Sequence, residues 1–188
     1  MLRALLAAVI LALTAGCATL DTGATALRPP RDTIEAFRIE GRIAVRRADE
    51  SFSAGIEWRH DAQSDDIVVS GPLGQGLARL TAGGGAALLE TADRKRYVAA
   101  DLDGLSAQVF GTPLPVSGLG RWVLGRPAGD GAARLDAAGR PASLAEQGWV
   151  IEYLRYESEA PDALPELLQA KREDVEVRLK IDSWNLFR

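Results

Sequence analysis

Apolar and polar residues alternate along several stretches of the chain, which is the pattern of β-strands with one buried face. One such stretch covers residues 37–46, and a second covers residues 52–59 after a short polar turn. The sharpest alternation covers residues 175–182. Runs of period two joined by short turns predict an antiparallel sheet whose strands are buried on one side and exposed to water on the other.

Shorter strand signals fill most of the remaining chain between these runs. We expect strands or strand-like runs at 67–70, 76–80, 86–91, 97–99, 133–136, 142–146 and 149–156. The triple glycine at 83–85 is most simply a tight turn, because it has neither the lysine nor the strand-loop-helix context of a phosphate-binding loop. The total of ten or eleven strands indicates a mainly β fold with a strongly curved or partly closed antiparallel sheet.

Two segments near the middle of the chain follow the helical period instead. Residues 101–110 carry apolar side chains at helical spacing, and a second short helix is expected at 119–125, with Ser117 as its cap. A helical turn capped by Asp32 is also expected at 32–36. Short helices that interrupt a run of strands usually cross one open face of the sheet, so we expect them to cover its apolar side.

The central segment 67–80 (IVVSGPLGQGLARL) contains an unusual turn. Turn tips normally carry glycine, asparagine, aspartate or serine, whereas this one places Leu73 between Pro72 and Gly74. A leucine that projects from a rigid loop suggests contact with a membrane. The alternative is that Leu73 folds back onto the sheet, since single exposed leucines are ordinary on protein surfaces.

The first sixteen residues predict a targeting leader. They contain one positive charge, an apolar run at 4–13 that is too short to span a bilayer, and small residues before Cys17. The segment 13–17 resembles the bacterial lipobox, in which the cysteine becomes the first residue of the mature protein and is acylated. A buried core thiol is the alternative for Cys17, but it leaves the leader unexplained. Residues 17–31 then form the acylated cysteine and a flexible tether, and residues 32–188 form a single domain.

The resemblance to the lipobox has consequences for location. It implies a thioether-linked diacylglycerol and an amide-linked acyl chain on Cys17, with no other cofactor. In lipoprotein sorting, an aspartate directly after the cysteine retains the protein in the inner membrane, and Ala18 stands at that position here. The resemblance therefore implies a lipid anchor in the outer membrane, with the domain facing the periplasm. Several acyl chains on one cysteine provide stable anchoring.

Composition excludes some classes of function. The 188-residue chain has a net charge of −4 at pH 7, which argues against a nucleic-acid partner because such proteins carry a basic patch. No nucleophile elbow, nucleotide loop or metal-ligand cluster is present in the sequence, and the single histidine, His60, is expected to lie in a turn or at the surface, so the chain is not expected to be an enzyme. The basic run 94–96 is interpreted as a solvated hairpin end, with contact to phospholipid headgroups as the alternative.

Three motifs together carry a specific resemblance to a known family. The segments 69–74 (VSGPLG), 121–127 (RWVLGRP) and 180–184 (KIDSW) occur in the order and spacing of the LolB family of outer-membrane lipoprotein insertion proteins. The resemblance covers essentially the whole mature chain. It implies an unclosed half β-barrel of about eleven strands with a helical lid over a hydrophobic cavity.

The resemblance also implies a function and a set of partners. A LolB-like protein accepts acylated lipoproteins from the periplasmic carrier LolA and inserts them into the outer membrane, so the implied partners are a LolA-like carrier, acylated cargo and outer-membrane phospholipid. In that family, a leucine on a protruding loop engages the membrane, and Leu73 matches it in the segment formed by Pro72, Leu73 and Gly74. A monomer is expected.

Apolar residues on the predicted inner face are candidates to line the cavity. They are Ile43, Val45, Trp58, Trp122, Trp149, Leu179 and Ile181. Ordinary core packing explains each of them equally well, because periodicity identifies the apolar face without separating a filled core from a hollow one. The alternative function is therefore an outer-membrane lipoprotein that acts as a structural or assembly module with a solid β core.

Overall fold

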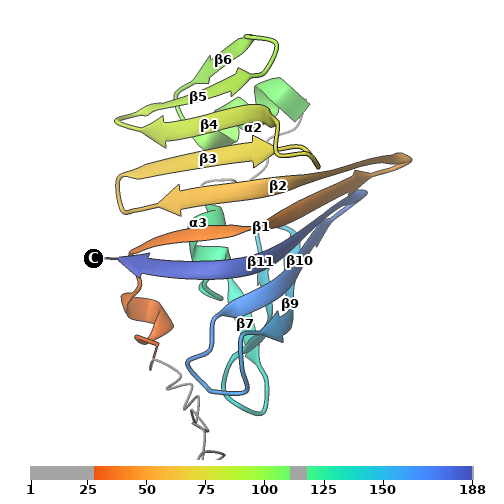
Figure 1. Cartoon of the computed structure of the whole chain (residues 1–188). Helices are drawn as coiled ribbons and strands as arrows, with labels where there is room; N and C mark the ends of the chain where they lie inside the picture. Colours follow the sequence, from red (N-terminus) through yellow and green to blue (C-terminus); the bar gives the residue numbers. More distant parts are fainter. Residues whose placement is uncertain (1–27, 111–117, 188) are drawn as a thin grey trace, which may run out of the picture.

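A computed structural model describes residues 28–110 and 118–187, and within these ranges the chain forms one antiparallel sheet of eleven strands with few helices (Figure 1). This confirms the predicted fold class. The strands are β1 (Ala36–Arg47), β2 (Glu50–His60), β3 (Ser64–Ser70), β4 (Gly76–Gly83), β5 (Ala86–Thr91), β6 (Arg96–Ala99), β7 (Ala132–Leu135), β8 (Pro141–Glu146), β9 (Trp149–Tyr156), β10 (Pro165–Arg172) and β11 (Val175–Phe187). The helical elements are η1 (Arg31–Thr33), α2 (Leu102–Phe110) and α3 (Leu119–Trp122).

The order of the strands explains why helices cover one face. The chain runs from the centre of the sheet to one edge through β1–β6, and from the other edge back to the centre through β7–β11, where β11 pairs with β1. The edge strands β6 and β7 do not pair with each other, so the sheet stays unclosed. The connection between the two edges contains α2 and α3, which lie on the same side of the sheet (Figure 1).

A bulge at the centre of the sheet contributes to its curvature. The pairing of β1 with β11 shifts register between Glu40 and Gly41, because Glu40 faces Ser183 whereas Gly41 faces Ile181. Bulges of this kind bend a strand and increase its twist. A Cβ atom at Gly41 would lie 2.0 Å from the backbone oxygen of Lys180, so only glycine fits at this position.

Buried apolar side chains form two clusters on the concave face. The larger cluster connects α3 and the segment after it to the strands on both sides of the β1–β11 pair. The smaller cluster contains Ala87, Leu102 and Leu105, and joins α2 to β5. Leu80 of β4 is half-buried and packs against both clusters. The alternation in the sequence therefore identified the buried face correctly.

Three details differ from the sequence-based expectations or lie outside the described residues. The predicted helical turn at 32–36 is wrong, because a 3₁₀ turn at Arg31–Thr33 follows Pro30 and has no side-chain cap, so Asp32 does not cap it. Strand β10 was not expected as a separate strand. Ser117 and Cys17 lie outside the described residues. None of the helices in the described part of the chain is long and apolar enough to cross a membrane.

Candidate functional site

The loop between β3 and β4 holds Leu73 away from the rest of the protein. The Leu73 side chain is 94% exposed. The loop is closed by backbone bonds from Gly71 N to Gln75 O (2.8 Å) and from Gly74 N to Gly71 O (2.9 Å), and Gly74 adopts a positive φ of 78°. The Leu73 amide also donates to the side-chain oxygen of Gln75 (3.1 Å). These bonds fix the loop in a conformation in which Pro72, Leu73 and Gly74 are all exposed.

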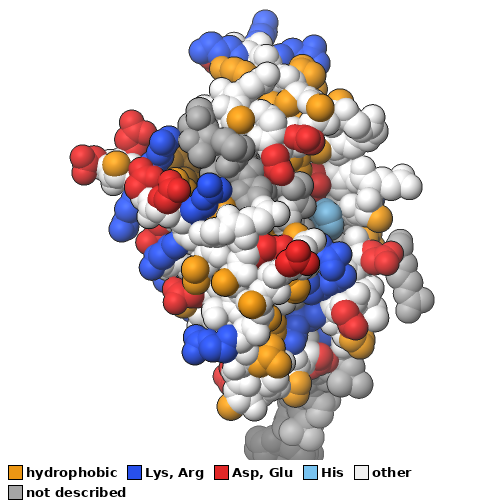
Figure 2. Space-filling model, turned by 180° about the vertical axis from the view of Figure 1, so that it is seen from behind, with side chains coloured by type: hydrophobic (Ala, Val, Ile, Leu, Met, Phe, Trp, Pro, Cys, Tyr) orange, Lys and Arg blue, Asp and Glu red, His pale blue; other side chains and the backbone are white. Residues whose placement is uncertain are grey.

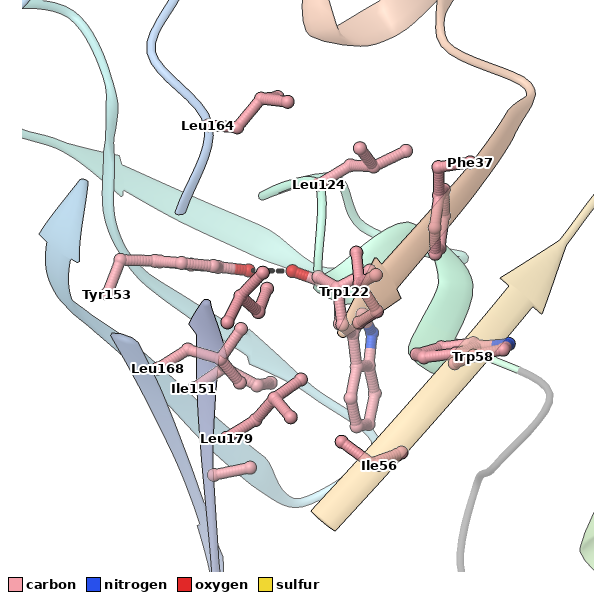
Figure 3. Close-up of a cluster of buried hydrophobic side chains, with 14 of the residues drawn as sticks. Phe37, Ile56, Trp58, Trp122, Leu124, Ile151, Tyr153, Leu164, Leu168 and Leu179 are labelled. Carbon is pink, nitrogen blue, oxygen red and sulfur yellow. Dashed lines mark hydrogen bonds between the residues drawn. The ribbon is translucent and has the colours of Figure 1, made fainter. Parts of the chain in front are cut away.

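Most of the seven candidate cavity residues lie in the packed core. Five of them, Trp58, Trp122, Trp149, Leu179 and Ile181, are at most 5% exposed. Figure 3 shows Trp58, Trp122 and Leu179 within the same cluster of side chains. The other two candidates, Ile43 and Val45, are half-buried residues near the far end of β1. In this conformation, α3 and the concave face therefore fill the space between them with their own side chains.

A strip of partly buried apolar side chains borders this packed core. Ile43 of β1, Val69 of β3, Leu80 of β4 and Leu119 of α3 each pack against the larger cluster without being fully buried. Leu80 also connects the strip to the smaller cluster under α2. The apolar surface of the concave face thus continues between the two helices, where side chains cover it less completely.

A buried carboxylate fastens α3 to the sheet. Glu146, at the end of β8, is 6% exposed. One of its oxygens accepts hydrogen bonds from the Trp122 indole nitrogen (2.7 Å) and from the Ala128 amide (2.8 Å). The second oxygen, Oε1, has no partner among the described residues, and neither has the buried indole nitrogen of Trp149. Glu146 therefore holds both the helix and the segment that follows it.

Two further side chains fix α3 and the residues that follow it. The Tyr153 hydroxyl donates to the backbone oxygen of Trp122 (2.7 Å; Figure 3), and burial raises the pKa of Tyr153, so this donor stays protonated. The Arg126 guanidinium donates to the backbone oxygens of Ile34 (2.9 Å) and Arg31 (3.3 Å), and burial lowers its pKa. Tyr153 of the sheet thus holds the backbone of α3, and Arg126 holds the segment after α3 to the start of the domain.

His60 has a structural position rather than the expected place in a turn or at the surface. Its ring nitrogen Nδ1 lies 2.7 Å from a carboxylate oxygen of Asp65, which also accepts a hydrogen bond from the Trp58 indole (2.7 Å). The ring packs against Phe37, with the ring centroids 4.9 Å apart. A Cβ atom at Gly120 of α3 would lie 2.6 Å from the His60 ring. The His60 ring therefore lies directly against the backbone of α3 at Gly120.

Two surface pockets lie away from the strip of partly buried side chains. One, of about 460 Å³, is formed by β4, β5 and β6 around Thr81, Leu88 and Val98. The other, of about 570 Å³, lies between residues 129–130 and the β8–β9 hairpin, and includes Glu146 and Trp149. Residues 28–110 and 118–187 contain no group of three potential metal ligands.

Comparisons with known proteins agree with this architecture. The family model of the outer membrane lipoprotein LolB matches residues 35–184. The chain is 39% identical over 186 residues to the outer-membrane lipoprotein LolB of Azoarcus sp. (strain BH72), covering 98% of this chain and 96% of the relative. It is 40% identical over 197 residues to the LolB of Pseudomonas paraeruginosa, covering 97% of this chain and 96% of the relative.

A solved structure shows the same fold at low sequence similarity. A LolA superfamily protein from Nitrosomonas europaea superposes with a TM-score of 0.51 at 9% identity, covering 86% of this chain and 89% of that one. The unclosed sheet with its helical cover is therefore a fold that this chain shares with that LolA superfamily protein. The match to the family model and the similarity over nearly the full length both identify one particular family, LolB. The chain belongs to the LolB family, whose members serve lipoprotein localisation and are not enzymes.

Proposed function

We propose that this protein accepts acylated lipoproteins from a LolA-type periplasmic carrier and inserts them into the periplasmic leaflet of the outer membrane. The observation that carries the proposal is the combination of a continuous apolar concave face with a leucine that is 94% exposed on a hydrogen-bonded loop. An apolar face can shelter an acyl chain, and an exposed apolar tip can engage a bilayer. Both features occur in a chain that belongs to the LolB family.

The energetics of the cargo explain why an apolar site is required. Exposure of an acyl chain to water costs about 0.8 kcal/mol for each methylene, so a chain of typical length costs roughly 10 kcal/mol. A transfer protein must shelter that surface and yet release it to the bilayer. Direction comes from the difference in affinity for the acyl chain between carrier, transfer protein and membrane, so no catalytic group is needed.

The acyl chain is proposed to enter along the strip formed by Ile43, Val69, Leu80 and Leu119. These side chains are only partly buried, so they can contact an apolar ligand with little rearrangement. Deeper entry requires α3 to move away from the sheet, which would open the space around Trp58, Trp122 and Leu179. The helix α3 has only four residues and is held by a few polar bonds together with the buried Trp122 side chain, so it is the element whose displacement would open this space.

Anchoring and location follow from the leader and from the family. We propose that residues 1–16 are removed, that Cys17 is acylated, and that residues 17–31 connect the lipid to the domain. The curated relatives are named outer-membrane lipoproteins, and Ala18 follows the cysteine where an aspartate would favour the inner membrane. The domain is then tethered to the outer membrane, faces the periplasm and acts as a monomer.

Transfer into liposomes tests this function. All eleven strands and both clusters lie within residues 28–187, so a chain that begins at Ala18 retains them. In this soluble form, the wild type should take an acylated lipoprotein from its carrier and insert it into liposomes. Leu73→Glu should fold and accept cargo but fail to insert it, because a charged tip is repelled by the bilayer core.

A matched control uses another exposed leucine. Leu154 on β9 is 48% exposed, so Leu154→Glu adds the same charge at a site away from the loop and should insert cargo normally. Equal loss of insertion in both variants would contradict a special role for Leu73. Loss of folding in Leu73→Glu alone would contradict the exposed position of this side chain.

The packed core favours a second candidate function, that of a structural or assembly module. Five of the seven candidate cavity residues are at most 5% exposed, as expected for a solid β core. Uptake of a fluorescent fatty acid by the soluble protein separates the two functions. Saturable uptake supports the transfer function, whereas no uptake, together with no cargo transfer, assigns the protein to the assembly module.

A further inference from the structure

A basic turn lies beside the Leu73 loop at the same end of the sheet. The Ala92 amide in the β5–β6 turn donates to the backbone oxygen of Leu77 (2.8 Å), and Thr91 pairs with Ala78. Because neighbouring strands run in opposite directions, the β3–β4 loop and the β5–β6 turn emerge on the same side (Figure 1). Leu73 lies four positions before Leu77, so its backbone lies at most about 14 Å from that of Leu77.

This turn concentrates positive charge in a chain that is acidic overall. Arg94 and Lys95 in the turn and Arg96 at the start of β6 lie near two acids, Asp93 and Glu90, whereas the chain has a net charge of −4. Arg94 adopts a positive φ of 67° and makes no ion pair with any described residue. The side chains of Lys95 and Arg96 are 67% and 63% exposed. Figure 2 shows several lysine and arginine side chains at the top of the molecule, along the edge of the sheet that β5 and β6 form.

The acids near the turn neutralise only part of this charge. Lys95 lies 2.8 Å from Asp93, and Arg96 lies 3.1 Å from Glu90. Hydrogen bonds from Lys95 and Thr91 lower the pKa of Asp93 to about 2, so this carboxylate is charged at neutral pH. Exposed ion pairs are weak, however, and their cations can exchange one carboxylate for another anionic partner. Residues 67–78 of the neighbouring loop and strands contain no charged side chain, so no acid opposes such an exchange there.

We propose that the turn formed by Arg94, Lys95 and Arg96 binds the phosphates of anionic phospholipids in the bilayer that Leu73 enters. The inference rests on the proposed function, because it requires the Leu73 end of the sheet to meet a membrane. The headgroup layer is about 5–7 Å thick on each side of the hydrocarbon core, so entry of Leu73 into the core brings the cations of a neighbouring turn at the same end of the sheet near that layer. Two contacts of different chemistry, one apolar and one cationic, orient the protein on the membrane.

Binding to vesicles of defined composition tests the proposal. The soluble chain that begins at Ala18 is mixed with vesicles of phosphatidylcholine alone or with added phosphatidylglycerol, and the bound fraction is measured by flotation. Each cation near an anionic surface strengthens binding about fivefold, so Arg94→Gln combined with Lys95→Gln should weaken binding to the anionic vesicles by about 30-fold. Binding to neutral vesicles should stay unchanged, and high salt should remove the difference.

A control with the same change in net charge isolates the position of the cations. Arg42 on β1 and Arg178 on β11 are exposed on the outer face of the central strands, so Arg42→Gln combined with Arg178→Gln should alter binding by less than twofold. Equal weakening in the two double variants would overturn the proposal, as would a wild type without any preference for anionic vesicles.

Leu73→Glu separates the failure of this inference from the failure of the proposed function. If the tip enters the bilayer, this variant loses binding to both kinds of vesicle. Normal binding of Leu73→Glu to both would contradict the membrane role of the tip, and a preference for anionic vesicles that depends on Arg94 and Lys95 would still support the basic turn. If Leu73→Glu loses binding but the Arg94 and Lys95 double variant keeps the wild-type preference for anionic vesicles, the role of the basic turn would be overturned and that of the Leu73 tip would stand.

Discussion

Replacement of Glu146 by alanine should destabilise the protein strongly, although this residue lies outside the proposed membrane loop. The carboxylate accepts hydrogen bonds from the Trp122 indole nitrogen (2.7 Å) and the Ala128 amide (2.8 Å), and its side chain is 6% exposed. Removal of the acceptor leaves a buried indole donor without a partner. The cost is greater than the loss of one bond because Trp122 is only 2% exposed, so its indole donor also loses the compensation for its burial.

The magnitude follows from the surroundings of the two donors. Hydrogen bonds to charged groups contribute about 1.5–3 kcal/mol each, and the bond from Trp122 belongs at the upper end because it is buried. Ala128 is exposed, so water can replace its partner and its share is about 1 kcal/mol. The total loss in the free energy of unfolding is about 3–4 kcal/mol, which lowers Tm by roughly 6–16 °C in a chain of this size.

Urea unfolding of three variants measures this effect. Glu146→Gln keeps an acceptor at the same position and should lose only about 1 kcal/mol. Glu166→Ala removes an exposed carboxylate that pairs with Arg155 at 2.7 Å, and should change stability by less than about 1 kcal/mol. The reasoning would be refuted if Glu146→Ala were no less stable than Glu166→Ala, with the same dependence on urea in both.

Three further predictions follow from single positions. Gly41→Ala should cost at least about 2 kcal/mol in urea unfolding, because the added carbon meets a backbone oxygen at 2.0 Å, whereas Gly76→Ala, with nothing within 4 Å, should change stability by less than about 0.5 kcal/mol. Gly120→Ala should push α3 away from the His60 ring, and so should lower thermal stability while raising uptake of a fluorescent fatty acid; unchanged uptake would argue against opening at α3. Hydrogen bonds from the backbone of Arg140 and from its side chain help to hold the pKa of Asp136 below 3.8. The stability that the Asp136 carboxylate contributes is therefore lost as pH falls below that value. In a series of thermal unfolding experiments at decreasing pH, the Tm of Asp136→Asn should fall less steeply than that of the wild type.

Strand β10 shows where the reading of periodicity failed. Its pairing with β9 shifts register twice, between Pro165 and Leu167 and again between Leu167 and Leu168. The shifts interrupt the alternation between Pro165 and Leu168, where two partly buried residues separate two buried ones, so only a short regular run follows. By contrast, the strand signals at 37–46, 149–156 and 175–182 correspond to strands with a regular inner face, and each was predicted.

The polar residues that hold α3 were also missed by the sequence reading. One signal was present, because Glu146 lies two residues after Leu144 and so occupies the apolar face of its strand. A carboxylate on such a face requires a buried partner. The sequence did not identify that partner, because Trp122 lies 24 positions before Glu146. Tyr153, whose hydroxyl also bonds to Trp122, lies 31 positions after Trp122.

The loop around Leu73 shows what a local sequence pattern predicts and what it leaves open. The composition of Pro72, Leu73 and Gly74 predicted a tight turn with an apolar tip, but an exposed tip and a tip folded onto the sheet were both compatible with it. In the structure Leu73 is exposed, and the Gln75 side chain stabilises the loop by accepting a hydrogen bond from the Leu73 amide. It also places the basic turn around Arg94 beside this loop, which required the pairing of β4 with β5.

Beyond the unclosed half-barrel, which the resemblance to the LolB family implied, the sequence by itself determined a curved or partly closed antiparallel sheet, its apolar face and the two covering helices. These features depend on local backbone geometry, because the two-residue period of a strand and the 3.6-residue period of a helix are visible in any short window. Only the tertiary structure decided that Trp58, Trp122 and Leu179 belong to one packed core, and that Glu146 and Tyr153 fasten α3. Contacts between side chains from distant parts of the chain depend on how strands and helices meet in space, and a periodic pattern carries no information about that.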